Sequence, residues 1–529
     1  MCRLRLKQEG TVEFKNFTTG AFTRLSIIFI GLFFLLLTIG TAFAIPVERV
    51  WITPWGVILA MRFVGQQYRS RQNNIYWKRF IRYPILYALH PYVSGGDRQW
   101  RLPGFRKTDG DFDHWRAELW AEYPEAEANW QKIILSLLPR FRPKVGVCVP
   151  IYRLNFETEV KPTLDSLRHQ TYPLDLIVVA FNEPADPAEE RELRLREIHE
   201  YIESIGDDRF IVLDLLPGKR EAMAAAFREI IARLGTPIVT SDGANEMDLR
   251  NVMIVNADGD TVFDIDTIAV GIHALLEDRQ AQALTSNVQV INAEENRLTF
   301  QTYMRYIFAN NRERAAQHYR VTCMSGPCMI MYGRNIQEIL NHPDEWEHQM
   351  FGGEKVGPGD DRQLTQAHLV RGLGVIYNPE VLTETECPVD IPRWKLQQLR
   401  WNRSALRGFL TKVNDGRFYT HYGAWSIFDE FYLATFGFIL IGIVARLMIE
   451  TMIVGLQEGF LEAVLFVLPF LGIVLLMNLV RTIAEILNNH DLRFWKSSFY
   501  LYYLVRYLIP IKIKAVLTLT NNKWLGRPN

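Results

Sequence analysis

The stretch Met253-Ile254-Val255-Asn256-Ala257-Asp258-Gly259-Asp260-Thr261 decides the fold of this chain. An apolar run ends in two aspartates that are one residue apart, which is how a buried strand delivers two carboxylates to the edge of an α/β sheet. Two carboxylates at that spacing suit a hard divalent cation, Mg²⁺ or Mn²⁺, which can also hold a nucleotide diphosphate. A surface turn gives the same pattern, so the rest of the chain has to decide between the two.

Strands and helices alternate around this stretch. Apolar runs predict buried strands at 145–150, 176–181, 210–216 and 252–256, and helical patterns cover 189–205 and 220–234. This alternation predicts a mostly parallel sheet with its chemistry at the carboxyl ends of the strands. No Gly-x-Gly-x-x-Gly follows the first strand, which argues against a dinucleotide fold of the dehydrogenase type.

Long apolar segments lie on both sides of this α/β region. Residues 25–47 carry no charge and are too long for a signal peptide, so we expect a membrane anchor. Further spans are predicted at 51–68, 431–445 and 463–480, and an apolar segment at 494–520 is broken at Pro510. Lys and Arg cluster before the first span and after the second, which predicts that the α/β region is cytoplasmic.

The composition excludes some classes of protein. Lys plus Arg and Asp plus Glu balance at 59 each, so no net charge attracts nucleic acid. The five cysteines are scattered, and no Cys-x-x-Cys pair is present. We therefore expect reduced thiols rather than disulfides or a zinc site.

Three more polar motifs follow in the α/β region. Pro-Gly-Lys-Arg at 217–220 opens a helix and is suited to phosphate, although a solvated basic turn is the alternative. Ser-Gly-Pro at 325–327 is a turn that lets the backbone approach a ligand closely. Gly-Asp-Asp-Arg at 359–362 offers one carboxylate that stays ionised and one that can accept a proton, and a simple helix cap is the alternative.

A fourth motif, Gln-x-x-Arg-Trp at 397–401, lies on a predicted amphipathic helix just before the third span. The tryptophan could anchor the helix at the membrane interface. Alternatively, its aromatic face could stack on a sugar ring while the arginine reaches a diphosphate.

In this order, the motifs resemble those of processive membrane-embedded family 2 glycosyltransferases, the group of hyaluronan, chitin and cellulose synthases and the alginate polymerase subunit. The resemblance covers about residues 145–410 and the flanking spans. Gly-Asp-Asp-Arg and Cys-x-Ser-Gly-Pro look closer to hyaluronan and chitin synthases than to cellulose synthase, which has Thr-Glu-Asp. Gly-Lys-Arg and the two-helix N-terminus are also similar to the alginate polymerase, so that choice stays open.

This resemblance implies an α/β glycosyltransferase A-type domain with a mostly parallel sheet, flanked by N- and C-terminal transmembrane helices. The protein would be a multi-pass protein of the plasma (inner) membrane with its catalytic domain in the cytoplasm. The implied divisions are an N-terminal transmembrane hairpin and its cytoplasmic flank (1–94), an amphipathic or insertion segment (95–143), the glycosyltransferase domain (144–392), interfacial helices (393–424) and a C-terminal channel region with a gating tail (425–529).

The resemblance also implies roles for individual residues. The general base would be Asp361, with Asp360 and Arg362 beside it in the catalytic group, and the metal would be held by Asp258 and Asp260. The nucleotide-sugar would be bound by Tyr152, Arg153, Asn182, Glu183, Lys219, Arg220, Asp258, Gln397, Arg400 and Trp401. The acceptor would contact Ser325, Gly326, Pro327 and Trp401, and the gate would contain Trp524 and Arg527.

Two features depart from the family pattern, namely residues 182–183 and an acidic insertion at 241–250 before the fourth strand. Asn182 and Glu183 stand where the family often has an aspartate that meets uracil, so either residue could take that role, or the base could differ. Gating by Trp524 and Arg527 needs a cytoplasmic C-terminus, whereas three spans after the α/β region would leave it outside. The break at Pro510 allows two short or re-entrant segments instead.

The implied reaction is an inverting, Mg²⁺- or Mn²⁺-dependent polymerisation of a β-linked polysaccharide from a UDP- or GDP-sugar, with export of the polymer across the membrane. Its partners would be the donor, the growing polysaccharide, the lipid bilayer and export or regulatory subunits, with no nucleic acid. Two alternatives are a transferase that moves one sugar to a polyprenyl phosphate and a non-catalytic transport or scaffold subunit. Gln-x-x-Arg-Trp argues against the first, and the intact acidic motifs argue against the second.

Overall fold

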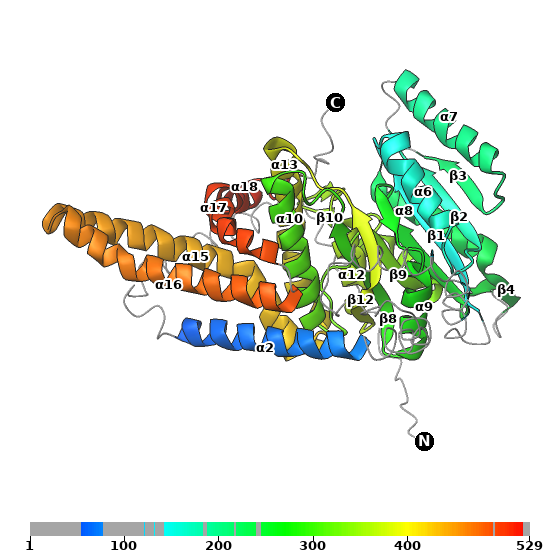
Figure 1. Ribbon diagram of the computed structural model, residues 1–529. Helices are drawn as coiled ribbons and strands as arrows, with labels where there is room; N and C mark the ends of the chain where they lie inside the picture. Colours follow the sequence, from blue (N-terminus) through cyan, green and yellow to red (C-terminus); the bar gives the residue numbers. More distant parts are fainter. Residues whose placement is uncertain are drawn as a thin grey trace, which may run out of the picture.

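The computed structural model describes residues 54–77, 142–183, 188–215, 218–239, 245–489 and 492–521, together with the single residues 121, 128 and 132. The first apolar segment (25–47), most of the 95–143 segment, and Trp524 and Arg527 lie outside the described residues. The described part consists of an α/β domain from which a long helical hairpin projects (Figure 1).

An eight-stranded sheet forms the centre of the α/β domain, in the order β3-β2-β1-β6-β9-β8-β12-β7. The strands are β1 (Lys144–Ile151), β2 (Leu176–Phe181), β3 (Phe210–Asp214), β6 (Val252–Ala257), β7 (Thr261–Phe263), β8 (Ala281–Val290), β9 (Cys328–Tyr332) and β12 (Gly374–Thr385). The neighbours β3-β2, β2-β1, β1-β6 and β8-β12 are parallel. The strand β9 is antiparallel to β6 and β8, and β7 is antiparallel to β12.

The four strands predicted from the sequence are all present. β1, β2 and β6 lie within a residue of the predicted bounds, and β3 ends at Asp214, two residues early. The helices predicted at 189–205 and 220–234 are α7 (Ala188–Ile205) and α8 (Lys219–Leu234). β2 and β6 are buried at every position, because a central parallel strand is covered on both faces and is therefore apolar throughout.

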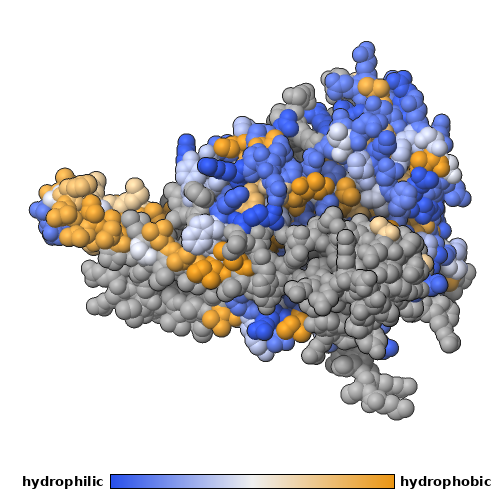
Figure 2. Space-filling view, in the orientation of Figure 1, coloured by the Kyte–Doolittle hydropathy of each residue, from blue (hydrophilic) through white to orange (hydrophobic). Residues whose placement is uncertain are grey.

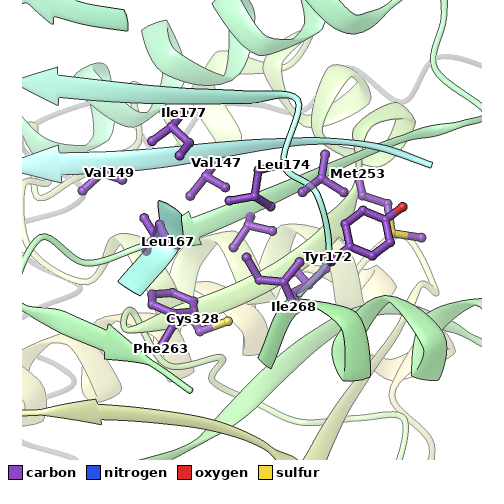
Figure 3. Packing of buried hydrophobic residues seen from close by; sticks show 14 of the residues in the cluster. Val147, Val149, Leu167, Tyr172, Leu174, Ile177, Met253, Phe263, Ile268 and Cys328 are labelled. Atoms are coloured by element: carbon purple, nitrogen blue, oxygen red, sulfur yellow. The ribbon is translucent and has the colours of Figure 1, made fainter. Parts of the chain in front are cut away.

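Hydrophobic clusters cover both faces of the sheet. Val147 and Val149 of β1 belong to one cluster, which Figure 3 shows, and Cys148 between them belongs to the other. This alternation follows from the two-residue period of a strand. On the second face, a Cβ atom at Gly146 would overlap Ile230 of α8, so that helix lies directly against β1 and its first residue, Lys219, has a fixed place.

The remaining elements surround the sheet and connect its strands. They are α2 (Pro54–Trp77), η3 (Phe156–Val160), α6 (Lys161–Arg168), β4 (Thr236–Val239), β5 (Asn245–Asp248), α9 (Thr267–Glu277), α10 (Arg297–Phe308), η4 (Ala309–Arg314), α11 (Gly333–Leu340), η5 (Pro343–Glu345), β10 (Met350–Phe351), β11 (Glu354–Lys355), α12 (Asp360–Leu369), α13 (Ile391–Val413) and α14 (Gly416–His421). The strands β4 and β5 pair as a hairpin just before β6, which accounts for part of the acidic segment 241–250.

The projecting hairpin consists of α15 (Ala424–Gln457) and α16 (Phe460–Asn489), which pack against each other. These helices contain the spans predicted at 431–445 and 463–480. Among the described residues, α15 is the one helix that is long and apolar enough to cross a membrane. Apolar side chains gather at the far end of the hairpin (Figure 2), where Leu456 is 81% and Phe460 84% exposed.

The chain after the hairpin forms four helical segments of different type that follow one another without a gap. It forms η6 (Leu492–Phe499), α17 (Tyr500–Tyr503), η7 (Leu504–Leu508) and α18 (Ile509–Leu517). Pro510 is the second residue of α18, directly after the π-helical segment η7. The end of this segment packs on α13, because Arg407 donates to the carbonyl oxygens of Leu519 at 2.9 Å and Asn521 at 2.7 Å.

Candidate active site

A lysine joins two carboxylates at the carboxyl end of β6. Lys219 Nζ lies 2.6 Å from Asp258 Oδ1 and 3.2 Å from Asp360 Oδ2. Asp258 directly follows β6, and Asp360 is the first residue of α12. Burial alone would lower the pKa of Lys219, but the charges of the two carboxylates raise it above its usual value. Three motifs that are far apart in the sequence thus meet at one point.

The Ser-Gly-Pro turn lies against Asp258. Asn256 of β6 donates from Nδ2 to the Gly326 carbonyl oxygen at 2.9 Å, which fixes the turn to the strand. A Cβ atom at position 326 would lie 2.4 Å from Asp258 Oδ2. Only glycine therefore leaves that carboxylate in its present position. The approach of this turn to a ligand stays a prediction.

The residues on either side of Gly326 differ in exposure. Ser325 is buried, and its N–H donates to Thr285 Oγ1 at 2.8 Å. Pro327 is partly exposed. Gly326 is buried as well, so Pro327 is the one of the three residues predicted to meet an acceptor that is partly exposed.

The two aspartates at the start of α12 have different environments. Asp360 is buried, and although burial would raise its pKa, the charges of Lys219 and Arg220 lower it. Asp361 is partly exposed, and burial together with the charge of Asp360 raises its pKa. One carboxylate is therefore held ionised while the other is shifted toward accepting a proton, which is the division that a general base beside a charged partner requires.

The helix start that carries these aspartates packs directly on α13. Gly359 begins α12 with a φ of 91°, and a Cβ atom there would overlap the hydroxyl of Ser404 on α13. One turn further along, a Cβ atom at Gly408 would lie 3.0 Å from Arg362 Cδ. The helix of Gln-x-x-Arg-Trp and the helix of Gly-Asp-Asp-Arg therefore form one packed unit.

Arg220 does not share the environment of Lys219. Its side chain is 1% exposed and donates to the carbonyl oxygens of Trp346 at 2.9 Å and Pro358 at 3.2 Å, and to Gln349 Oε1 at 3.1 Å. These bonds hold the 346–358 segment that leads into α12. Lys219 therefore lies at the carboxylates, whereas Arg220 lies beneath the 346–358 segment that positions Asp360.

Tyr152, Arg153, Asn182 and Glu183 come together, because they follow the adjacent parallel strands β1 and β2. Glu183 accepts from the Arg153 N–H at 2.8 Å and from Arg194 at 2.7 Å. Asn182 is fully buried, and neither atom of its side-chain amide has a hydrogen-bond partner among the described residues. Of the two candidates for contact with a base, Asn182 is therefore the one with unused hydrogen-bonding capacity.

Gln-x-x-Arg-Trp lies in the middle of α13, and its tryptophan meets α10. The rings of Trp401 and Tyr306 make an edge contact at 6.0 Å between centroids. The guanidinium carbon of Arg305 lies 5.8 Å from the centre of the Trp401 ring, and the same guanidinium donates to Gln398 Oε1. Sequence reasoning missed Arg305 and Tyr306, because no motif surrounds them and only the packing of α10 on α13 brings them here.

The other two residues of the motif, Gln397 and Arg400, are partly exposed on α13. Gln397 Oε1 accepts a long hydrogen bond from Gln398 at 3.5 Å. Asp260 lies near Tyr306, the neighbour of Trp401. The pKa of Tyr306 is raised mainly by burial, and the charge of Asp260 raises it further.

The donor set at the end of β6 can be tested against a metal ion. Asp258 and Asp260 flank Gly259, where a Cβ atom would lie 2.7 Å from Leu154 Cδ1, so the turn that carries both carboxylates is tightly packed. Among the described residues, no group of three or more His, Cys, Asp or Glu is placed to hold a metal. Two carboxylates fit Mg²⁺ or Mn²⁺, which proteins bind through one or two carboxylates plus substrate phosphates and water.

Comparison with known proteins identifies this region. The family model described as glycosyltransferase like family 2 matches residues 143–404. This chain carries a family 2 glycosyltransferase domain. The matched residues of the glycosyltransferase domain include every strand of the eight-stranded sheet, α12, and α13 as far as Ser404.

The chain is also similar in sequence to hyaluronan synthases. Hyaluronan synthase 3 of Mus musculus is 31% identical over 310 residues, which are 58% of this chain and 50% of that protein. Hyaluronan synthase 2 of Homo sapiens is 28% identical with the same coverage. The chain therefore spans about half the length of the curated relatives it matches. Among solved structures, the mannosyltransferase PcManGT from Pyrobaculum calidifontis, in complex with GDP-Man and Mn²⁺, matches 74% of this chain and 93% of its own with 16% identity and a TM-score of 0.44.

Proposed function

We propose that this chain is a processive, inverting glycosyltransferase that builds a β-linked polysaccharide from a nucleotide-sugar at the cytoplasmic face of the plasma (inner) membrane. The observation that carries the proposal is the meeting of Asp258, Lys219 and Asp360 at the start of a helix that packs on α13. The helix α13 carries Gln-x-x-Arg-Trp and leads into the hairpin of α15 and α16. The similarity to hyaluronan synthases favours a hyaluronan-like product over an alginate-like one.

In this proposal, the donor diphosphate lies beside Lys219. The ammonium group of Lys219 compensates the negative charge of the diphosphate. A divalent cation held by Asp258 and Asp260 would supply further neutralisation of the departing diphosphate. Asn182 offers its buried amide to the base. Arg220 acts as a positioning residue, since its bonds to the 346–358 segment hold Asp360 in place rather than reaching the nucleotide.

Asp361 takes the proton of the acceptor hydroxyl in this mechanism. Its raised pKa brings the carboxylate closer to the operating pH, which makes it a better proton acceptor than an ordinary aspartate. The acceptor oxygen then attacks the anomeric carbon from the face opposite the diphosphate, so an α-linked donor gives a β-linkage. The nucleotide diphosphate leaves as the glycosidic bond forms.

The acceptor sugar would rest near Trp401, whose ring is held by Tyr306 and Arg305. An aromatic face packs well against the C–H face of a pyranose. Pro327, the partly exposed residue of the Ser-Gly-Pro turn, would border the acceptor as well, with Gly326 beside it. Arg400 and Gln397 would complete this part of the site.

We propose that the polymer leaves through the membrane region next to α13. A buried ion pair at 2.5 Å, between Lys412 of α13 and Glu430 of α15, couples that helix to the hairpin. The short segments after α16 return the chain to α13, where Arg407 binds the carbonyl oxygen of Asn521. The tail with Trp524 and Arg527 would therefore start on the cytoplasmic side, as gating requires.

The proposal is tested by incubating the purified full chain with a panel of UDP- and GDP-sugars and Mg²⁺ or Mn²⁺. Free nucleotide diphosphate and the size of the labelled product are both measured. We expect diphosphate release together with a high-molecular-weight polymer, most readily from the sugars of hyaluronan. Transfer of one sugar to an added polyprenyl phosphate would support the lipid-linked alternative, and no release with any donor would contradict an enzymatic function.

A further inference from the structure

A hollow of about 740 Å³ is lined by residues at the beginnings of β8, β12 and α15. The strands β6 and β8 run in the same direction, because both are antiparallel to β9. The hollow is at the amino end of β8, whereas Asp258 follows the carboxyl end of β6. The two sites are therefore at opposite ends of the sheet, and the mechanism above makes no use of the hollow.

The lining of this hollow is strongly basic. The described residues that line it include four arginines and one histidine, namely Arg69, Arg279, Arg320, Arg334 and His318, and none of these described lining residues is an aspartate or glutamate. The arginines come from α2, the turn before β8, the segment beside β12, and α11, so no single motif explains the cluster. Burial and the charge of Arg69 lower the pKa of His318, as expected where positive charges gather.

The partners that hold these arginines are neutral. Arg69 lies over the ring of Trp425 at 4.6 Å. Arg320 donates to the Tyr319 carbonyl oxygen at 3.2 Å, and Arg334 donates to Gln282 Oε1 at 3.0 Å. These contacts orient the side chains, and within the described part of the chain none of the three arginines forms an ion pair with a carboxylate.

The carboxylate of Asp278 lies behind the hollow and is bonded to two of the residues that line it. It accepts from the Tyr319 hydroxyl at 2.7 Å and from the Gln280 N–H at 3.0 Å. It is 7% exposed and is not part of the lining. Among the described residues, the side chains that line the hollow therefore carry positive charge and no carboxylate.

A helix start adds to this positive character. The residues 423–426, which begin the 34-residue helix α15, all line the hollow. Gly423 caps the helix with no side-chain hydrogen bond, so the first N–H groups of α15 receive no cap from the described side chains. Unpaired N–H groups at a helix start and the helix dipole both favour an anion, in addition to the arginines.

We propose that this hollow binds a phosphate-bearing anion and that the anion is the headgroup of an anionic phospholipid. Its position favours a lipid, because α15 is the candidate membrane-spanning helix and begins at the hollow with Trp425, a residue type that prefers the membrane interface. Basic pockets between membrane helices on the cytoplasmic side are suited to such headgroups. The inference rests on the membrane placement in the proposed function, and not on its chemistry.

The test uses the full chain purified in neutral detergent. The protein is titrated with phosphatidylglycerol or with phosphatidylcholine, and the retained lipid is counted by native mass spectrometry. A parallel arm adds inorganic phosphate and follows the thermal midpoint. The variants are Arg69→Gln, Arg320→Gln and the exposed Arg334→Gln, and the matched control is Arg196→Gln, whose side chain is 65% exposed on α7.

We expect preferential retention of phosphatidylglycerol, weakened about fivefold by each substitution in the hollow and unchanged by Arg196→Gln. Three variants from different elements guard against misfolding of any one of them, and each must keep the wild-type midpoint in phosphatidylcholine. Equal retention by wild type and all three variants would overturn the proposal. Stabilisation by inorganic phosphate that depends on the arginines, without any lipid preference, would keep the anion site and overturn the lipid assignment.

The outcome is independent of the chemistry at the opposite end of the sheet. If the protein makes polymer but retains no anionic lipid in preference to the neutral one, only this inference fails. If lipid retention depends on the arginines but no donor is consumed, the proposed function fails and the anion site stands.

Discussion

Alanine at position 326 should disable the active site while leaving the protein folded. Its Cβ atom would lie 2.4 Å from Asp258 Oδ2, and ordinary contacts of this kind begin near 3.4 Å. The turn cannot easily retreat, because Asn256 binds the Gly326 carbonyl oxygen at 2.9 Å. The carboxylate must therefore move by about 1 Å, away from a position that is also fixed by Lys219.

A displacement of about 1 Å in a catalytic group can reduce the rate by about 10²-fold, or about 2.7 kcal/mol of barrier. We expect Gly326→Ala to lower kcat/KM for the donor by about this factor, measured as the release of nucleotide diphosphate. The required divalent-cation concentration should rise as well, since Asp258 belongs to the proposed metal pair. The thermal midpoint should change little, because Asp258 is partly exposed and its side chain can turn away.

The matched control is Gly416→Ala, because a Cβ atom at that glycine meets no atom within 4 Å. Both substitutions add one methyl group to a glycine with an ordinary backbone conformation, so their difference isolates the contact with Asp258. Wild-type kinetics and cation requirement for Gly326→Ala would refute the reasoning, since they would show that the position of Asp258 is not important for the reaction.

Two further predictions concern buried groups. Arg220→Met should lower the free energy of unfolding by about 3 kcal/mol, because it leaves the buried carbonyl oxygens of Trp346 and Pro358 without their donor. Thermal unfolding should show this loss of stability. The control substitution Arg196→Met, at an exposed arginine, should leave the free energy of unfolding unchanged. Burial lowers the pKa of His368 to about 4, so the folded protein favours the neutral ring. The free energy of unfolding therefore decreases as the pH falls from about 6.5 toward 4, by up to about 3 kcal/mol. His368→Gln should therefore show a smaller drop in thermal midpoint than wild type between pH 7 and pH 4.5, and equal drops would contradict the assignment.

The sequence predicts the centre of the fold well, because central parallel strands are apolar at every position and are bounded by motifs. β1, β2 and β6 follow from this rule, and α8 and α13 follow from their helical periodicity. The strands β8, β9 and β12 were not predicted. They pair with partners distant in the sequence, and polar residues such as Thr285 and Asn287 interrupt the apolar pattern of β8.

The motifs of the site were predicted more completely than the roles of their members. A sequence motif does not show which way a side chain points, so Lys219 and Arg220 looked equivalent although only Lys219 lies among the carboxylates. Residues contributed by packing alone, such as Arg305 and Tyr306, carry no local signal. The glycines that allow α12 to pack on α13 gain their meaning only from the contact between the two helices.

The most direct test of the account is the product made by Asp361→Asn, compared with wild type under identical donor and Mg²⁺ or Mn²⁺. We predict that the variant binds the donor nucleotide normally but makes polymer about 10²- to 10⁴-fold more slowly, because a positioned base is lost. Polymer of wild-type length made at a near-normal rate by Asp361→Asn would contradict the central claim.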